Sequence, residues 1–269
     1  MRVRRIHVLV VFLALAACLI PFRTKVRSAA VSAIQVLKGK KSVAERVTEF
    51  GDAVHKRVAA RFKEVGVAYP PKRINLVGLK REQVLEVWVS GGSGQCEYLT
   101  TYPILGASGT LGPKLVEGDG QVPEGVYKID SLNPNSLYHL ALRVDYPNRF
   151  DRAKGALDGR AALGSDIMIH GKSASIGCLA MGDQAAEDLF VMAAESGIEN
   201  ITVILSPVDF RIRSLPATMP KVPPWTEELY ADIRCELMKL TRQPDGAANR
   251  SQPSRSETNR TSSAAGSRR

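Results

Sequence analysis

The sequence predicts a mainly β domain with a few helices, whose strands form a sheet-on-sheet or barrel-like core. Between residues 74 and 145, short segments alternate apolar and polar side chains, and turns rich in glycine and proline separate them. Helical periodicity is confined to an amphipathic segment before the strands and to one segment late in the chain. The chain has 269 residues and is 44% apolar, which is enough for one sizeable domain between two non-globular ends.

An amphipathic helix is predicted ahead of the strands, within residues 24–66. Ser42 is placed to cap its N-terminus and Gly66 to end it, with Pro70 and Pro71 beyond. We expect this helix to pack on the domain or to act as a stalk, in preference to lying on a membrane surface. Its apolar stripe, spaced by three or four residues, is Val43, Val47, Phe50, Val54, Val58, Phe62 and Val65.

The predicted strands are short and follow one another closely. A glycine- and proline-rich loop interrupts them at residues 106–125, a turn is expected at Asn133–Ser136, and a second loop covers residues 146–165. Asp183 is expected to cap a helix that ends at Ser196, before Gly197. The strands are Ile74–Leu79, Val84–Val89, Glu97–Ile104, Val126–Asp130, Tyr138–Asp145, Ile167–His170 and Ile201–Leu205.

The N-terminus predicts export. Arginines at positions 2, 4 and 5 precede a mostly apolar run from Ile6 to Ile20, as in a secretory signal or a short membrane anchor. Leu15–Cys18 also resembles a lipobox, which would make Cys18 a lipid-modified N-terminus. An uncleaved anchor, a lipoprotein and plain cleavage all stay open, and each places the working domain in the periplasm or cell envelope.

The predicted organisation has five parts. They are a signal peptide or anchor (1–22), a basic linker with the amphipathic helix (23–71), the catalytic domain (72–215), a C-terminal extension (216–240) and a disordered basic tail (241–269). The net charge of +10 lies partly in the segment after the apolar run and partly in the tail. Because export argues against nucleic acid as a partner, we expect solubility and attraction to anionic lipid or wall polymer.

The cysteines indicate one thiol kept free. With Cys18 assigned to the targeting segment, three cysteines are left for an oxidising compartment. Cys178 is the candidate free thiol, and Cys96 with Cys235 is then a possible disulfide.

The chemical centre is predicted at residues 166–183, where an apolar run ends at His170-Gly171 and Ser175-Ile176-Gly177-Cys178 follows. A base at a strand end and a thiol at a glycine turn eight residues later can lie side by side. This arrangement suits a cysteine nucleophile, which needs an imidazole and backbone N–H donors for the acyl oxygen. Zinc binding by His170 and Cys178 lacks further ligands at suitable spacing, so no metal and no cofactor are expected.

This block resembles the catalytic domain of the L,D-transpeptidase family, which has the YkuD-like fold, and within that family the YafK-like branch. The His-Gly and Ser-x-Gly-Cys motifs match, and the stretches 108–130 and 132–153 resemble the elements that precede the site, so the resemblance covers residues 74–207. Many members have a histidine just before the Gly-Cys and an arginine two residues after it. This chain has Ile176 and Ala180 there, which fits the YafK-like branch.

The resemblance implies that Cys178 attacks the carbonyl after the L-centre of diaminopimelate in a peptidoglycan stem peptide, with His170 as general base and acid. Backbone N–H groups near Gly177 and Cys178 would hold the oxyanion, while Gly171 would let the backbone orient the imidazole and Ser175 would support the loop. The acceptor stays open between an amine (transpeptidation) and water (an amidase that releases peptidoglycan-linked protein). Candidate substrate-binding residues are His139, Arg143, Tyr146 and Arg152, for each of which a structural or surface role is also open.

Two rival classes are considered. A non-catalytic cell-wall binding module could use the same fold, but it would be expected to lack the cysteine or the histidine, and both are present. A papain-like protease is disfavoured because the cysteine follows the histidine closely here.

Overall fold

One eight-stranded sheet forms the framework of the protein in the computed structural model, which describes residues 39–92 and 94–241. The strand order is β3-β2-β1-β8-β4-β5-β6-β7. The mainly β prediction is confirmed, and the strands make one curled sheet instead of two stacked sheets. The strands are β1 (Arg73–Leu79), β2 (Val84–Ser90), β3 (Glu97–Pro103), β4 (Gly125–Ser136), β5 (His139–Val144), β6 (Met168–His170), β7 (Leu179–Ala180) and β8 (Ile201–Ser206).

The sheet is mixed, and its order brings distant segments together. β1, β2 and β3 form an antiparallel meander, while β8 joins β1 in parallel with Ile74 opposite Ile201. β4 runs antiparallel to β8, and β4, β5 and β6 continue in antiparallel order. β6 then pairs with β7 in parallel, so the strand that ends at His170 lies beside the strand that follows Cys178.

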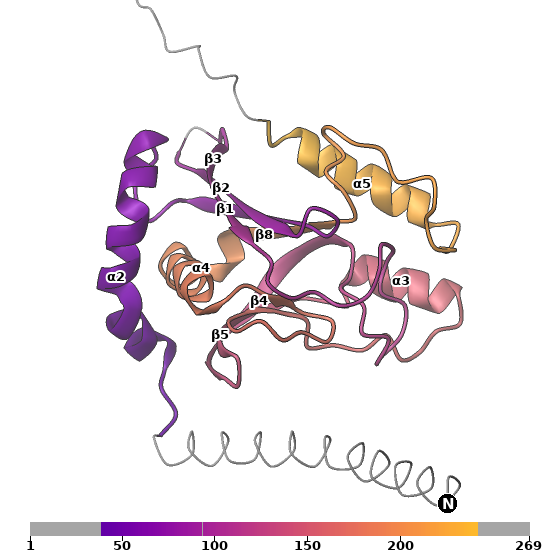
Figure 1. The fold of residues 1–269 in the computed structure, drawn as a ribbon, viewed down its shortest axis with the longest axis horizontal. Helices are drawn as coiled ribbons and strands as arrows, with labels where there is room; N and C mark the ends of the chain where they lie inside the picture. The colour runs from indigo at the N-terminus through magenta and orange to yellow at the C-terminus, as the bar shows by residue number, and fades with distance from the viewer. Residues whose placement is uncertain (1–38, 93, 242–269) are drawn as a thin grey trace, which may run out of the picture.

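Helices cover both faces of the sheet (Figure 1). α2 (Val43–Glu64) lies along α4 (Asp183–Ser196) on one side, and α5 (Thr226–Met238) packs on β4 and β8 on the other. The alternation of β1 feeds both layers, because Ile74 and Leu76 belong to the apolar cluster under α2 and α4. Val77 and Leu79 belong to the cluster under α5.

The predicted amphipathic helix is confirmed as α2. Ser42 and Glu45 form a reciprocal capping box at its N-terminus, and the helix ends at Glu64 with Val65 as its C-cap. Arg57 reaches from α2 to the buried carboxylate of Asp188 on α4, with Nε 2.8 Å from Oδ1. This helix therefore packs on the domain through a buried ion pair as well as through its apolar stripe.

Three local expectations are corrected, and one segment without an assigned element proves to contain a helix. The predicted loop 146–165 contains helix α3 (Arg149–Leu157), which starts at a capping box between Asn148 and Asp151. β4 runs through the predicted turn Asn133–Ser136, where shifts in register absorb the irregular sequence. The C-terminal extension contains α5. Finally, Gly182 is the N-cap of α4, because the Asp183 carboxylate accepts the backbone N–H of Lys172 instead of capping the helix.

Several predictions concern residues outside the described part of the chain: the signal or anchor (1–22), the lipid-modified Cys18, and nearly all of the tail (241–269). Within residues 39–92 and 94–241, no helix is both long enough and apolar enough to cross a membrane. The possible disulfide does not form, because Cys96 and Cys235 are both free thiols. The sulfur of Cys96 instead accepts a hydrogen bond from the side-chain amide of Asn75.

Candidate active site

The pairing of β6 with β7 places the strand that ends at His170 beside the residues that directly follow Cys178. In this parallel pair Ile169 lies opposite Leu179 and His170 opposite Ala180. Cys178 comes directly before β7, two residues from the partner of His170. The backbone N–H of Met181 donates to the His170 carbonyl at 2.7 Å, which fixes the register beyond the site.

His170 is held as a neutral imidazole with a defined tautomer. Its side chain is almost completely buried, and its Nδ1 lies 2.6 Å from the Gly171 carbonyl oxygen. A carbonyl can only accept a hydrogen bond, so Nδ1 carries the proton and Nε2 carries the free lone pair. Burial lowers the pKa of His170 below the ordinary value of 6.5, and the Gly171 carbonyl opposes this only in part. The ring of Tyr138 covers the imidazole at a centroid distance of 4.6 Å.

Gly171 is required by close backbone packing at the end of β6. A Cβ atom there would lie 2.7 Å from both the Tyr138 carbonyl oxygen and the Asp183 carboxylate. The next residue, Lys172, donates its backbone N–H to that carboxylate at 2.9 Å. The end of β6 is therefore fastened to the start of α4, and the carbonyl that orients His170 has little freedom to move.

Cys178 is a half-buried thiol in this structure. Its Sγ lies 3.5 Å from the Asp166 carbonyl oxygen and can donate its proton there. Burial raises the pKa of Cys178 above the ordinary value of 9.0, and the charge of Asp166 adds to this. A hydrogen bond from the Met168 backbone and the charge of Lys114 lower the pKa in opposition. Both shifts therefore favour the neutral forms, a thiol at Cys178 and a neutral imidazole at His170.

The amides predicted to hold the oxyanion are both engaged by hydroxyl groups. Gly177 donates its N–H to Ser108 Oγ at 2.6 Å, and Cys178 donates its N–H to Ser175 Oγ at 3.0 Å. Ser175 Oγ also donates to the Cys178 carbonyl at 2.6 Å, so this side chain closes the turn that carries the cysteine. Neither of these two amides is therefore free in this structure. An acyl oxygen would have to displace one of these hydroxyls.

Two of the four candidate substrate-binding residues have packing roles. Tyr146 is 4% exposed and donates its hydroxyl to the Leu163 carbonyl at 3.0 Å, so it is not available to a substrate. His139 lies between helices, with Nε2 3.0 Å from a Glu187 carboxylate oxygen and its ring edge-on to Phe50. For His139 the structural role that the sequence left open is the observed one.

The two arginine candidates, Arg143 and Arg152, lie in different surroundings. Arg143 forms an ion pair with Asp166 at 3.1 Å, and the Asp166 carbonyl is the group that faces the thiol. Arg143 is therefore connected to the Cys178 thiol through Asp166, whose carboxylate pairs with Arg143 and whose carbonyl oxygen faces the sulfur. Arg152 is exposed on α3, and its side chain makes no hydrogen bond or ion pair within the described ranges.

Four residues near His170 or Cys178 were not predicted from the sequence: Ser108, Lys114, Tyr138 and Asp166. Lys114 is 7% exposed and is held by the Val116 carbonyl and the Asp119 carboxylate. Asp119 also accepts the backbone N–H groups of the loop around it. The sequence signal that could have indicated Lys114 is an aspartate five residues later, Asp119, within the same glycine-rich loop. Its meaning depended on the loop folding back to the cysteine.

The described residues include no cluster of three or more histidine, cysteine, aspartate or glutamate side chains that could hold a metal ion. The chemistry that this arrangement can perform is acyl transfer. A neutral imidazole, a thiol and a glycine turn are its parts.

Comparison with known proteins identifies the family. Residues 73–204 match the YkuD family, described as the L,D-transpeptidase catalytic domain. This match confirms the resemblance to the L,D-transpeptidase catalytic domain that the sequence indicated.

Among relatives, the chain is 40% identical over 113 residues to YafK of Escherichia coli K12, which is named only as a candidate L,D-transpeptidase. The match covers 41% of this chain and 43% of that protein, and YafK of Escherichia coli O157:H7 matches equally. The chain thus spans less than half the length of these relatives.

Solved structures are more distant. The helical cell shape determining protein Pgp2 of Campylobacter jejuni is 20% identical with a TM-score of 0.43, covering 61% of this chain and 58% of Pgp2. The first L,D-transpeptidase of Mycobacterium tuberculosis is 17% identical with a TM-score of 0.30, covering 50% of this chain and 62% of that chain.

Proposed function

We propose that this protein is an exported acyltransferase that processes peptidoglycan stem peptides through a thioester on Cys178. One observation carries the proposal: the hydrogen bond from Nδ1 of His170 to the Gly171 carbonyl leaves the Nε2 lone pair free to act as a base, at the end of the strand that pairs with the residues directly after Cys178. The family domain supports the reaction class and the substrate.

The proposed reaction has two steps: acylation of Cys178, and transfer of the acyl group to an amine or water. Nε2 of His170 takes the thiol proton as Cys178 Sγ attacks the carbonyl that follows the L-centre of diaminopimelate. The C–N bond then breaks, and the leaving amine takes the proton from Nε2. In the second half an amine or water loses a proton to Nε2 and attacks the thioester, and the departing thiolate regains that proton. A free amide in the loop would contribute about 3 kcal/mol to the transition state once a hydroxyl is displaced.

The pKa directions predict the pH dependence. Because the pKa of His170 is lowered, its protonation should reduce kcat/KM only below pH 6.5. Because the pKa of Cys178 is raised, the free thiolate should not form until the pH exceeds 9.0. The free enzyme should therefore react slowly with iodoacetamide at pH 7 while still turning over substrate. Fast alkylation at pH 6 would instead indicate a preformed thiolate–imidazolium pair and contradict the neutral-pair mechanism.

The test is product analysis by mass spectrometry. Wild type and Cys178→Ala are incubated with purified muropeptides and with sacculi that carry covalently bound protein. Cys235→Ala is the matched control, because it removes an exposed cysteine away from the site. Loss of terminal D-alanine with a new amide bond indicates transpeptidation, and release of protein without a new bond indicates the amidase.

The proposal predicts that Cys178→Ala and His170→Asn abolish either product while Cys235→Ala does not. Identical products from wild type and Cys178→Ala, or none from either, would favour the binding-module alternative. Export is tested separately, by fractionating cells and treating spheroplasts with protease. A protein that stays with the cytoplasm and is protected in spheroplasts would contradict a cell-envelope location.

A further inference from the structure

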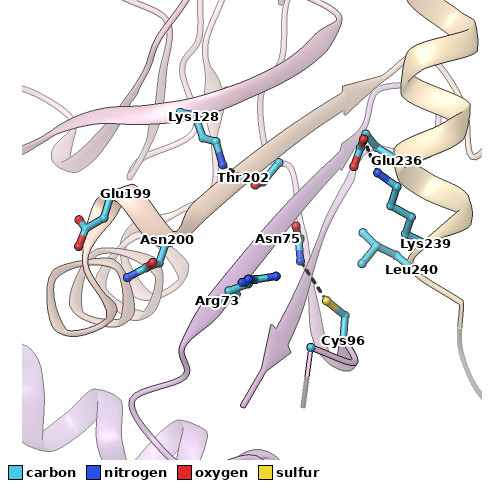
Figure 2. Close-up of a pocket in the computed structure, with 11 residues that line it drawn as sticks. Arg73, Asn75, Cys96, Lys128, Glu199, Asn200, Thr202, Glu236, Lys239 and Leu240 are labelled. Atoms are coloured by element: carbon cyan, nitrogen blue, oxygen red, sulfur yellow. Dashed lines mark hydrogen bonds and ion pairs between the residues drawn. The ribbon is translucent and has the colours of Figure 1, made fainter. Parts of the chain in front are cut away.

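A pocket of about 390 Å³ lies where the sheet extends past the end of α5 (Figure 2). Its lining comes from β1, β4 and β8, from the short 3₁₀ turn Ile198–Asn200, from the segment before β3 and from the C-terminal end of α5 with the two residues after it. No residue of the His170–Cys178 segment contributes to it. The lining residues are Arg73, Asn75, Gly94, Cys96, Lys128, Glu199, Asn200, Thr202, Glu236, Lys239 and Leu240.

The floor of this pocket is a polar row built by strand register. Asn75 on β1 lies opposite Thr202 on β8, and Thr202 lies opposite Lys128 on β4. The three side chains therefore stand next to each other on one face. Arg73 and Asn200 come two residues before Asn75 and Thr202, so they extend the same face.

Further along the strands this face becomes apolar. Val77, Ile204 and Val126 form the next row, and they pack in the cluster under α5. Because α5 ends at Met238, the apolar row is covered and the polar row is left open. The change from apolar to polar side chains thus coincides with the end of the covering helix, which makes the pocket a feature of the fold.

Two cations in the pocket have no carboxylate partner within the part of the chain that the structure describes. Lys128 Nζ contacts only the hydroxyl of Thr202, at 2.9 Å, and the guanidinium of Arg73 makes no hydrogen bond or ion pair there. The two acids in the lining are directed elsewhere. Glu236 pairs with Lys239 at 2.6 Å. Glu199 folds back over Gly197, and Figure 2 shows its carboxylate turned away from Lys128 and Arg73.

This chemistry selects a polar anion. The lining contains no aromatic ring on which a sugar or a nucleobase could stack, and Leu240 is its one large apolar side chain. A guanidinium, an ammonium, two amides and a hydroxyl are donors that suit a carboxylate or phosphate oxygen. The volume is at the lower end of small-molecule pockets. We propose that this pocket binds a small polar ligand through a carboxylate or phosphate group held between Arg73 and Lys128, at a site separate from the catalytic residues.

The test uses thiols that the chain already carries. Cys96 lines the pocket, whereas Cys235 is exposed on α5 and does not line it. The full-length chain, kept in detergent at low ionic strength, is treated with a neutral maleimide. Mass spectrometry then follows both cysteines with inorganic phosphate, citrate, acetyl-trialanine or its C-terminal amide added. We expect at least one anion to slow modification of Cys96 at least threefold and to leave Cys235 unchanged.

Protection by acetyl-trialanine but not by its amide would identify a carboxylate ligand, and protection by phosphate alone would identify a phosphate ligand. In the double variant Arg73→Gln/Lys128→Gln, the apparent Kd should rise at least tenfold. The control Lys56→Gln/Lys221→Gln removes two exposed cations outside the pocket and should keep the wild-type Kd. The proposal is overturned if no probe protects Cys96 at millimolar concentration, or if both double variants lose protection equally.

Discussion

Among substitutions that change a side chain this little, Glu124→Gln is expected to destabilise the protein most. The carboxylate is completely buried, and both of its oxygens have polar partners. Lys80 Nζ lies 2.9 Å from Oε1, the Gly112 N–H donates to Oε1 at 2.7 Å, and the Tyr230 hydroxyl donates to Oε2 at 2.7 Å. Three segments, including α5, thus meet at one buried charge.

The expected magnitude follows from what Glu124→Gln leaves behind. Lys80 is nearly as buried, with 7% of its side chain exposed, and burial already lowers its pKa. In this variant the Lys80 ammonium loses the negative charge it is paired with and is left with neutral acceptors, which include the Gly112 and Val122 carbonyl oxygens. Breaking a buried pair in this way costs about 3–5 kcal/mol of the free energy of unfolding. Tyr230→Phe removes one hydrogen bond to a charged group and should cost about 1.5–3 kcal/mol.

The assay is urea unfolding at pH 7, followed by tryptophan fluorescence and circular dichroism, on Glu124→Gln, Lys80→Met and the double variant. We expect the double variant to lose less than the sum of the singles, with a coupling of about 1–3 kcal/mol. The matched control is the exposed pair between Lys154 and Glu228, for which about 0–1 kcal/mol is expected. If Glu124→Gln costs no more than this surface pair, the reasoning from burial is refuted.

Three further predictions concern the site and its support. Lys114→Met should slow iodoacetamide modification of Cys178 several-fold at pH 8, because it removes the charge that lowers the pKa of the thiol. Lys114→Arg keeps that charge and should not slow the reaction. Equal rates in both variants would contradict this prediction. Gly171→Ala should cost about 1–3 kcal/mol in urea unfolding and most of the activity, because its Cβ would overlap the Tyr138 carbonyl; an unchanged variant would refute that packing. Burial raises the pKa of Asp151 to about 6, so the folded state binds the extra proton between pH 6 and 3.8, and lowering the pH through this window should stabilise wild type relative to Asp151→Asn by up to about 3 kcal/mol. Unfolding midpoints at pH 4 and 7 measure this difference, and parallel pH profiles for the two proteins would count against it.

The sequence determined those features that depend on neighbours along the chain. The periodicity of α2, its cap at Ser42 and the alternation in β1 are local, and the structure has each of them. The position of His170 at a strand end was also readable, because an apolar run stops there, and β6 does end at His170. Helix α3 could have been found too, since Asn148 followed by Asp151 is a capping pattern, but few large apolar residues mark its inner face.

Only the tertiary structure decided which long-range partners each side chain meets. The sequence could not show that Tyr146 is buried against Leu163, or that His139 pairs with Glu187 between helices. Likewise, the engagement of the two loop amides by Ser108 and Ser175 depends on loops that meet in space.

The polar pocket illustrates the same division. Asn75, Lys128 and Thr202 are unremarkable in the sequence, where each is one polar residue of an alternating strand. They form one row only because β8 inserts between β1 and β4, and that row is open only because α5 ends where it does. The alternation of side chains is set by local backbone geometry, whereas strand order and register are set by packing the whole chain around one core.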